Sequence, residues 1–400
     1  MLLGNLSTYS LAKTPVPEVS ADSVVLMDAA TGTILYSKNM DTAYPPASTT
    51  KIMTALLTLE NTKLEDTVTV GKNPPHADGS SIGIFEGEEI SVKNLLYGML
   101  LLSGNDCAEA LAEYVGGTKD NFAALMNKRA KELGCTETNF VNPSGLYDDK
   151  HRTSAKDLAI ILRELVKHPE FLQISSTYSY KIPPTNKHPE GIPLGNENKL
   201  INKASMYYYE GADAGKTGYT IQSSHSYVAS AVRNGQRLIV TLVHDTNKRF
   251  FEDSRALFDY GFNNFQLVSL FKKEDLVTSY NEDNLSIPLL AASDYYYVKD
   301  KTSSEVPKID IIKEQLSDKA FKKGDIILEA NVNFNNKVLE RLKLSSGIDH
   351  SLKPALGEKI IAAEKENKLI VYVGVFLLAS VLLILLAAGY KLRQKNKTFK

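Results

Sequence analysis

The segment that most restricts what this chain can form lies near its carboxyl terminus, where Leu369 to Tyr390 reads LIVYVGVFLLASVLLILLAAGY without a charged residue. As a helix rising about 1.5 Å per residue, it would extend roughly 33 Å, enough to cross a hydrocarbon core of about 30 Å. It is apolar on every side, whereas a helix lying in the membrane surface needs a polar face. We therefore expect residues 369–390 to form a single transmembrane helix rather than a buried core helix.

The two flanks of this segment differ in charge. Residues 391–400 contain basic but no acidic side chains, whereas the residues before Leu369 mix glutamate with lysine. Because basic flanks stay in the cytoplasm, we expect 391–400 to be a basic cytoplasmic tail and the rest of the chain to lie outside the cell membrane. Export requires a signal, yet Met1–Ala12 lacks both a basic start and a long apolar core. We interpret residues 1–22 as an N-terminal segment, either the remnant of a longer export signal or a start internal to one.

Composition excludes several classes of protein. The chain is 43% hydrophobic and 23% charged, as in an ordinary folded protein, and its net charge of −1 provides no basic field, so we expect no nucleic acid partner. Cys107 and Cys135 are too few for a disulfide scaffold and are interpreted as buried small side chains or one optional bridge. The histidines are scattered without ligand spacing, so we predict no metal and no cofactor.

Hydrophobic patterning divides the remaining chain into two domains. Residues 23–265 begin with a hairpin pattern at Ser23–Asn39 and continue with a mainly helical block. They end with strand-like runs and a helix near Phe251–Tyr260. This order predicts one α/β (α+β) domain whose sheet is completed by both ends of the segment. The expected helices are Ser48–Glu60, Ser91–Leu102, Asp106–Val115, Asn121–Leu133 and Ser154–Val166, and the later strands are Gly218–Ile221, Ser226–Val232 and Leu238–His244.

Residues 266–360 have a different residue pattern, typical of short strands. Short β-type runs alternate with charged turns at Leu276–Tyr280, Leu285–Leu290, Tyr295–Val298 and Ile326–Val332. The segment contains no cluster of histidine, cysteine or paired carboxylates. It is predicted to be a smaller β-rich domain without chemistry of its own, acting as a spacer or a contact module.

Three short motifs follow one another in the order that a serine acyl-transferase requires. Ser48–Lys51 (STTK) is an SxxK pattern, which on a helix places the hydroxyl and the amine on one face. Ser103–Asn105 (SGN) is an SxN pattern between two expected helices, and Lys216–Gly218 (KTG) leads into an expected strand. SxxK also occurs at Ser10–Lys13 and Ser269–Lys272, so the signal lies in the combination, which is typical of penicillin-binding proteins and class A β-lactamases.

At these residues the chain resembles the low-molecular-mass penicillin-binding proteins, the serine D-alanyl-D-alanine carboxypeptidases of the bacterial cell wall. Further segments carry the resemblance: Pro46–Thr54, Leu102–Asp106, Asn142–Leu146, Ser154–Ala159 and Tyr260–Phe262. The resemblance covers about residues 23–265 and implies the serine β-lactamase and penicillin-binding-protein fold, an antiparallel sheet with helices on both faces and a helical cluster. A β-rich second domain and a C-terminal membrane attachment also fit. Two residues depart from the family pattern, both outside the core motifs. One is Tyr219, which follows the KTG motif, and the other is Ser144, at a position where many members have histidine.

The chemistry of the motif residues can be stated from their functional groups. A serine hydroxyl is a weak nucleophile until a base takes its proton, and Lys51 can be that base if its pKa falls from about 10.4 through burial or repulsion by Lys216. A helix beginning at Ser48 would point backbone N–H groups toward a developing oxyanion. Lys216 and Thr217 offer an ammonium and a hydroxyl to a terminal carboxylate.

The resemblance assigns the remaining roles. It implies that Ser48, Lys51 and Ser103 are catalytic, with Ser103 relaying the proton toward the leaving amine. The substrate-binding set is Asn105, Lys216, Thr217, Gly218 and Tyr219. In this set, Asn105 holds the substrate amide and orients Lys51, and the backbone N–H of Tyr219 is the second oxyanion donor. Gly218 leaves room for a substrate to lie along the strand.

These residues lead to one main hypothesis and three competing ones. The main hypothesis is a membrane-anchored hydrolase on the cell-wall side that removes the terminal D-alanine from peptidoglycan stem peptides through an acyl-Ser48 intermediate. β-Lactam antibiotics would acylate the same serine. A class A β-lactamase needs a separate glutamate in an ExxLN pattern, and the nearest match between Asn105 and Lys216 is only Glu197–Ile201 (ENKLI). A non-catalytic penicillin sensor and a transpeptidase would carry the same three motifs.

Overall fold

A computed structural model of the chain describes residues 13–282, 285–334, 337–352 and 356–395. The described residues up to Leu270, together with Tyr296–Val306, form one compact unit; Phe271–Tyr295 and the described residues from Pro307 onward form another. Residues 1–12 of the expected N-terminal segment and residues 396–400 of the expected tail lie outside the described residues.

The first unit is built on a five-stranded antiparallel sheet with strand order β2-β1-β9-β8-β7. The strands are β1 (Ser23–Asp28), β2 (Ile34–Lys38), β7 (Ala212–Thr220), β8 (Ser224–Arg233) and β9 (Gln236–Asp245). In the middle of the sheet, β1 pairs with β9, so that Val25 lies opposite Thr241. The prediction that both ends of the segment complete one sheet is therefore confirmed.

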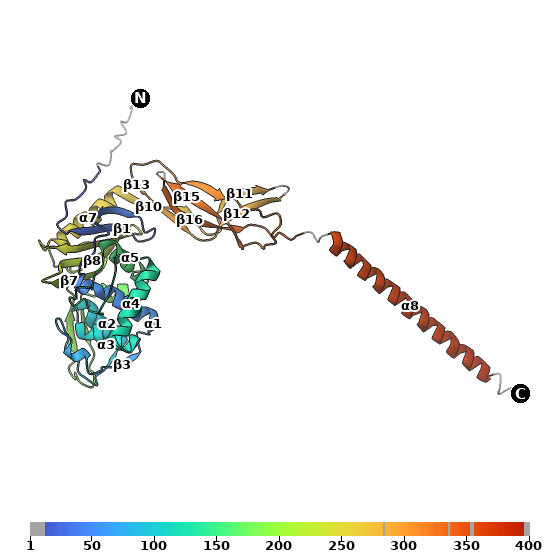
Figure 1. Ribbon diagram of the computed structural model, residues 1–400, viewed down its shortest axis with the longest axis horizontal. Coiled ribbons are helices and arrows are strands. Elements are labelled where there is room, and N and C mark those ends of the chain that lie inside the picture. Colours follow the sequence, from blue (N-terminus) through green and yellow to red (C-terminus); the bar gives the residue numbers. More distant parts are fainter. Residues whose placement is uncertain (1–12, 283–284, 335–336, 353–355, 396–400) are drawn as a thin grey trace, which may run out of the picture. The chain divides into compact units, whose positions relative to one another are not determined.

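Helices cover both faces of this sheet. Along β1, Val25 and Met27 enter one hydrophobic core, whereas Val24 and Leu26 enter another, as the two-residue period of a strand requires. On the first face, α5 (Ala155–Leu165) packs against β1 and β9; on the other, α7 (Phe250–Asn264) packs against β8 and β9. Figure 1 shows α5 and α7 on opposite sides of the strands.

A cluster of further helices extends the core on the α5 side (Figure 1). Its helices are α1 (Lys51–Asn61), α2 (Val92–Leu101), α3 (Asn105–Gly116), α4 (Lys119–Leu133) and α6 (Pro169–Ser175). Serine caps fix two helix starts as the sequence suggested: Ser91 accepts from the backbone N–H of Asn94, and Ser154 from that of Asp157. Two short hairpins complete the unit, β3 (Thr67–Thr69) with β4 (Glu89–Ser91) and β5 (Ser179–Ile182) with β6 (Ile192–Gly195).

Two local predictions need correction. The helix expected from Ser48 starts as a 3₁₀ turn, η1 (Ala47–Thr50), and becomes α-helical only at Lys51. The KTG motif does not precede a strand but lies inside β7, because pairing with β8 extends the ladder over residues of low strand propensity.

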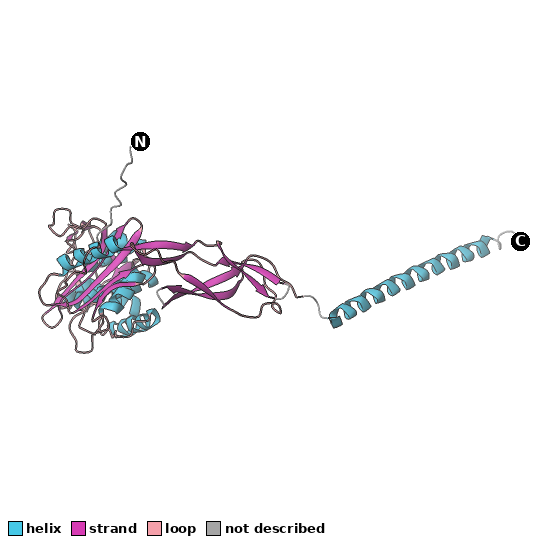
Figure 2. Cartoon of the chain, turned by 90° about the horizontal axis from the view of Figure 1, so that it is seen from above, coloured by secondary structure: helices cyan, strands magenta, loops and turns pink. Residues whose placement is uncertain are grey.

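The second unit is β-rich, as predicted, and Figure 2 shows it as strands and loops ahead of its one long helix. Its antiparallel sheet has the order β11-β12-β16-β15-β14. The strands are β11 (Leu276–Glu282), β12 (Leu285–Ala291), β14 (Lys308–Ile312), β15 (Ile326–Phe334) and β16 (Lys337–Ser346). The strand expected at Tyr295 exists as β13 (Tyr295–Asp300) but pairs outside this sheet, with β10 (Phe265–Phe271).

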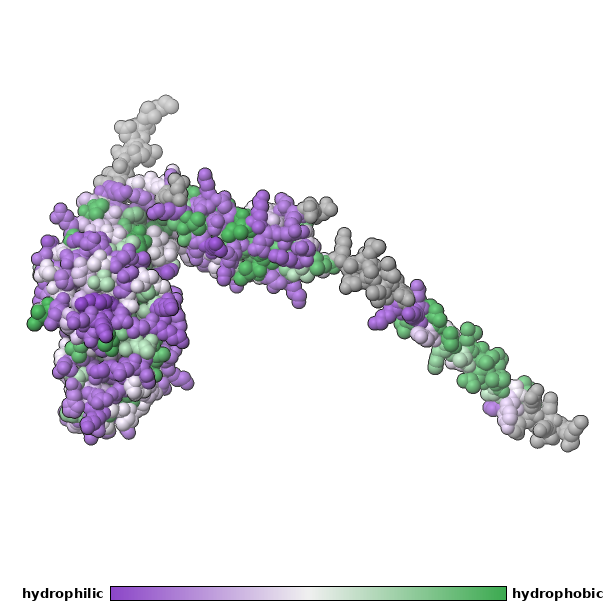
Figure 3. All heavy atoms as spheres, viewed as in Figure 1, coloured by the Kyte–Doolittle hydropathy of each residue, from purple (hydrophilic) through white to green (hydrophobic). Residues whose placement is uncertain are grey.

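The apolar C-terminal segment forms part of a long helix, α8 (Leu356–Lys395). Among the described residues, Lys365–Leu392 is the stretch of helix long and apolar enough to cross a membrane, and none of its most apolar window is buried in the protein. Figure 3 shows an apolar surface along the middle of this helix. Its length and composition suit a membrane anchor and include the predicted residues 369–390.

Candidate active site

The centre of the site is the contact between Lys51 and Ser48. Lys51 is fully buried, and its Nζ lies 2.8 Å from Oγ of Ser48. The same nitrogen donates to Oδ1 of Asn105 at 2.7 Å and to the backbone oxygen of Ser144 at 2.8 Å. These two oxygens accept both N–H bonds of a neutral amine. The nitrogen lone pair is then left facing the Ser48 hydroxyl, as a general base requires.

The surroundings of Lys51 favour that neutral form. Burial lowers the pKa of Lys51 well below its ordinary value of 10.5, and the positive charge of Lys216 lowers this pKa further. The negative charges of Glu197 and Asp106 oppose the shift without reversing it. Lys51 is thus a buried lysine whose pKa is lowered first by burial and then by the charge of Lys216.

The turn that carries Ser48 is held in an uncommon backbone conformation. Ala47 has a positive φ of 50°, and its oxygen accepts from Oγ1 of Thr50 at 2.8 Å. Oγ1 of Thr50 lies 2.9 Å from Nε2 of the buried His151, and Nδ1 of His151 accepts from the backbone N–H of Val141 at 3.1 Å. Because Nδ1 accepts, a neutral His151 carries its proton on Nε2 and donates it to Thr50. This chain of hydrogen bonds fixes the turn that carries the nucleophile.

The SGN motif forms the tight turn between α2 and α3. Ser103 is buried and has a positive φ of 61°, and Asn105 begins α3. The backbone N–H of Asn105 donates to the oxygen of Ser80 at 2.6 Å, and its side-chain amide donates to the oxygen of Asp78. Asn105 thereby joins Lys51 to the loop that precedes α2.

Asp106, immediately after this motif, holds the same loop in place. Its buried carboxylate accepts from the Ser81 hydroxyl at 2.7 Å. It also accepts from the backbone N–H groups of Ile82 at 3.0 Å and Gly83 at 2.9 Å. Asp106 also lies in the first turn of α3, where the helix dipole favours negative charge.

The KTG motif supplies the opposite wall from β7. Lys216 is buried, and burial lowers its pKa to about 8, with the charge of Glu197 partly opposing that shift. Nζ of Lys216 donates to the backbone oxygen of Thr217 at 2.9 Å and lies 3.8 Å from Oε2 of Glu197. The hydroxyl of Thr217 donates to the same Oε2 at 2.9 Å. An ammonium and a hydroxyl therefore converge on one carboxylate.

Gly218 brings this strand against the nucleophile turn. A Cβ at Gly218 would lie 2.9 Å from both the Pro46 oxygen and the Ser48 nitrogen. No side chain fits there without moving backbone, so glycine is needed for the close packing of β7 on η1, besides any room it leaves for a substrate. Tyr219 follows with a side chain that is 59% exposed and stacked on the ring of His225, with centroids 4.5 Å apart.

The chain matches the model of peptidase family S11, described as D-alanyl-D-alanine carboxypeptidase, over residues 10–247. It belongs to this carboxypeptidase family. Residues 265–351 match the C-terminal domain of penicillin-binding protein 5. Membership identifies the chain as a peptidase, and the resemblance read from the motifs is confirmed.

Individual relatives agree with this family. D-alanyl-D-alanine carboxypeptidase DacF of Bacillus subtilis is 37% identical over 264 residues, which are 64% of this chain and 66% of that protein, just under two thirds of its length. Penicillin-binding protein 5 of Haemophilus influenzae is 30% identical, with a TM-score of 0.69 over 84% of this chain and 98% of that chain. A variant of a Streptomyces DD-transpeptidase is also 30% identical, with a TM-score of 0.57 over 62% of this chain and 99% of that chain.

The fold of this S11 member brings the predicted site residues to one place. Hydrogen bonds join Ser48, Lys51 and Asn105, and Gly218 packs on the Ser48 turn. Ser103 lies two positions before Asn105 in the same turn, and Lys216, Thr217 and Tyr219 flank Gly218 on β7. The roles of these residues in catalysis stay predictions.

The contacts of four neighbours of the site were not predicted from the sequence: those of Asp106, the backbone oxygen of Ser144, His151 and Glu197. Asp106 gave a weak signal, because an acidic residue directly after an SxN motif falls in the first turn of a helix. Nothing in the sequence indicated the contacts of the other three residues, because their partners lie 20 or more positions away along the chain.

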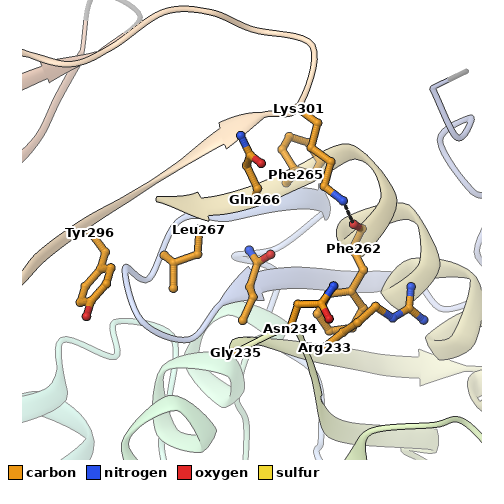
Figure 4. A pocket seen from close by; sticks show the side chains of 10 residues that line it. Arg233, Asn234, Gly235, Phe262, Phe265, Gln266, Leu267, Tyr296 and Lys301 are labelled. Carbon is orange, nitrogen blue, oxygen red and sulfur yellow. Dashed lines mark hydrogen bonds between the residues drawn. The ribbon is translucent and has the colours of Figure 1, made fainter. Parts of the chain in front are cut away.

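The described residues of this S11 chain also include two cysteines and a separate cavity. Within the described part of the chain, no group of three or more His, Cys, Asp or Glu side chains is arranged to hold a metal. Cys107 and Cys135 are both free. A cavity of about 360 Å³, lined by residues that include Arg233, Phe262 and Lys301, contains none of the predicted site residues. Nζ of Lys301 donates to the Phe262 oxygen at 2.6 Å. Figure 4 shows the side chains that line this cavity.

Proposed function

We propose that this chain is a serine-type carboxypeptidase that removes the terminal D-alanine from peptidoglycan stem peptides through an acyl-Ser48 intermediate. The observation that carries the proposal is the buried Lys51, whose N–H groups are taken by Asn105 and Ser144 while its nitrogen lies 2.8 Å from Oγ of Ser48. Family S11 membership supports the substrate class.

In the first half of the reaction, Oγ of Ser48 attacks the carbonyl carbon of the penultimate D-alanine as Lys51 takes the hydroxyl proton. The resulting oxyanion is stabilised by the backbone N–H groups of Ser48 and Tyr219, where Gly218 allows close approach. The C–N bond then breaks, and the proton passes through Ser103 to the leaving amine of D-alanine. The product is an ester between Ser48 and the shortened peptide.

In the second half, water attacks this ester and gives its proton to Lys51. The C–O bond breaks, Ser48 regains its proton, and the peptide leaves with a new carboxylate. Asn105 keeps Lys51 in place through both steps and offers its amide to the substrate backbone.

The terminal carboxylate of the substrate suits the donors on β7. The Lys216 ammonium and the Thr217 hydroxyl already converge on one carboxylate oxygen, that of Glu197. β-Lactam antibiotics also carry a carboxylate beside a reactive carbonyl, so we propose that they acylate Ser48 in the same pose. An amine acceptor in place of water would give transpeptidation, and the likeness to a DD-transpeptidase makes this the second candidate.

We also propose that α8 anchors the protein in the cell membrane, with the catalytic unit on the cell-wall side and the basic tail inside. The apolar length of Lys365–Leu392 supports a span, and the charge of the flanks supports this direction. Protease added to intact spheroplasts should degrade the catalytic unit and spare a C-terminal tag. Degradation of the tag alone would contradict this orientation.

Release of D-alanine from diacetyl-Lys-D-Ala-D-Ala by the full chain in detergent tests the activity. Ser48→Ala should abolish release and labelling by penicillin. Ser269→Ala is a matched control, because Ser269 begins another SxxK pattern but lies exposed on β10. Release that persists in the Ser48 variant, or absence of release by folded wild type, would contradict the proposal. Adding a D-amino acid or glycine as acceptor and measuring the exchanged peptide distinguishes transpeptidation from hydrolysis.

A further inference from the structure

We infer that Glu197 is a resident carboxylate in the subsite for the substrate's terminal carboxylate, which every anionic substrate or β-lactam must displace before it can bind. The inference rests on the proposed function, because it concerns the same Lys216 and Thr217 donors. It assigns Glu197 a competing role that limits the affinity of the site for anions.

The contacts of Glu197 are those expected of a bound carboxylate ligand. Oε2 accepts from the Thr217 hydroxyl at 2.9 Å and lies 3.8 Å from Nζ of Lys216. A side-chain oxygen of this same chain therefore uses the hydroxyl and the positive charge that a substrate carboxylate needs. Two carboxylates cannot share these donors without repulsion, so a ligand and Glu197 compete.

The backbone on both sides of Glu197 is fixed, so its position is not that of a loose surface side chain. The amide of Asn196 donates to the oxygens of Ser175 and Thr177, each at 2.9 Å. Asn198 is buried, and its Oδ1 accepts from the Tyr227 hydroxyl at 2.6 Å. The backbone N–H of Glu197 itself donates to the oxygen of Leu101 at 3.2 Å. These anchors present the carboxylate to β7.

The side chain can nevertheless be displaced. It is 46% exposed, whereas the side chain of Lys216 is only 2% exposed, so the Glu197 carboxylate borders solvent while the ammonium is buried. A carboxylate in this position can rotate into water at small cost, since a half-exposed ion pair contributes little. A ligand carboxylate can therefore take the place of the Glu197 carboxylate beside the buried Lys216 ammonium.

This arrangement predicts that Glu197 competes only with ligands that carry a carboxylate. Replacing Glu197 by glutamine removes the charge but keeps the shape, so anionic ligands should gain access to Lys216 and Thr217. A neutral ligand that reacts with Ser48 without using these donors should react at an unchanged rate. A change in the basicity of Lys51 would instead alter both rates, so the ratio of the two isolates the competition.

The experiment compares acylation of the full chain by benzylpenicillin and by its neutral methyl ester, followed by mass spectrometry of the intact protein. Glu197→Gln should raise the second-order rate for benzylpenicillin about fivefold and leave that for the ester unchanged. The KM for diacetyl-Lys-D-Ala-D-Ala should fall by a similar factor, with kcat little altered. Glu210→Gln is the matched control, because Glu210 is an exposed glutamate on the same connection between β6 and β7.

Each result decides one question. Equal acceleration of both ligands, no acceleration of either, or slower reaction with benzylpenicillin in the Glu197 variant would overturn the role of Glu197. Each of these three outcomes can occur while the wild type still releases D-alanine through Ser48. In that case the proposed function would stand and only the role of Glu197 would fail. If wild type neither releases D-alanine nor forms the acyl-enzyme, the proposed function fails and this inference fails with it.

Discussion

The Cβ position of Gly218 would lie 2.9 Å from the backbone nitrogen of Ser48, so the KTG strand and the nucleophile turn are in contact through backbone atoms. Gly218→Ala should therefore push β7 away from η1 and lower kcat/KM for D-alanine release about 100-fold, the effect expected of a displacement near 1 Å. Gly195→Ala, on β6, is the control, because nothing lies within 4 Å of its Cβ position. Normal kinetics in the Gly218→Ala variant would show that this close packing is unnecessary.

Lys51 should be required for acylation and not for folding. In Lys51→Met the base is lost while most of the volume is kept, so the rate of acylation by benzylpenicillin should fall about 1,000-fold. The oxygens of Asn105 and Ser144 lose a donor, which should lower the free energy of unfolding by about 1–3 kcal/mol. Stopped-flow acylation and urea unfolding measure the two effects. Lys272→Met is the control, because Lys272 belongs to the exposed SxxK pattern at the end of β10, and it should alter neither acylation nor D-alanine release. If the Lys51 variant is acylated at a rate near that of wild type, Lys51 is excluded as the base.

Lys216 should make the binding of anions depend on pH. Its ammonium form predominates below its pKa of about 8 and is lost as pH rises through that value. The rate of acylation by benzylpenicillin should therefore fall above about pH 8, approaching tenfold per pH unit. The neutral methyl ester should not show this decline. Equal pH profiles for the two ligands would mean that the charge of Lys216 does not bind the carboxylate.

His151 should make folding stability depend on pH in the acid range. Burial, with a smaller contribution from the charge of Arg152, lowers its pKa from 6.5 to about 4 against the opposing charge of Asp148. The unfolded chain thus binds a proton more readily than the folded chain. Stability from this group is present above pH 6.5 and is lost as pH falls toward 4, by on the order of 3 kcal/mol.

Glutamine at position 151 tests this effect, because its amide can donate to Thr50 and accept from Val141 without titrating. The free energy of unfolding of His151→Gln, measured with urea at several pH values, should decline less than that of wild type on acidification. Parallel declines in the two proteins would place the acid sensitivity in other groups.

Much of the fold followed from local patterns in the chain. The hairpin at Ser23–Asn39 and the helices predicted from Ser91 and Ser154 have signatures within a few residues, and the structure places elements there. The length of β7 could not be predicted in this way. Lys216 and Gly218 are poor strand formers, and their strand conformation comes from pairing with β8.

By itself, the sequence determined the three motifs and the apolar C-terminal segment. Each of these is written in residue types at short, fixed spacing. Only the tertiary structure decided that the Ser144 oxygen binds Lys51, that Asp106 secures the loop through Ser81, and that Glu197 occupies the donors of Thr217. These contacts join distant segments through individual atoms, and neither periodicity nor propensity specifies which atoms of two distant segments will meet, because that depends on how the whole core packs.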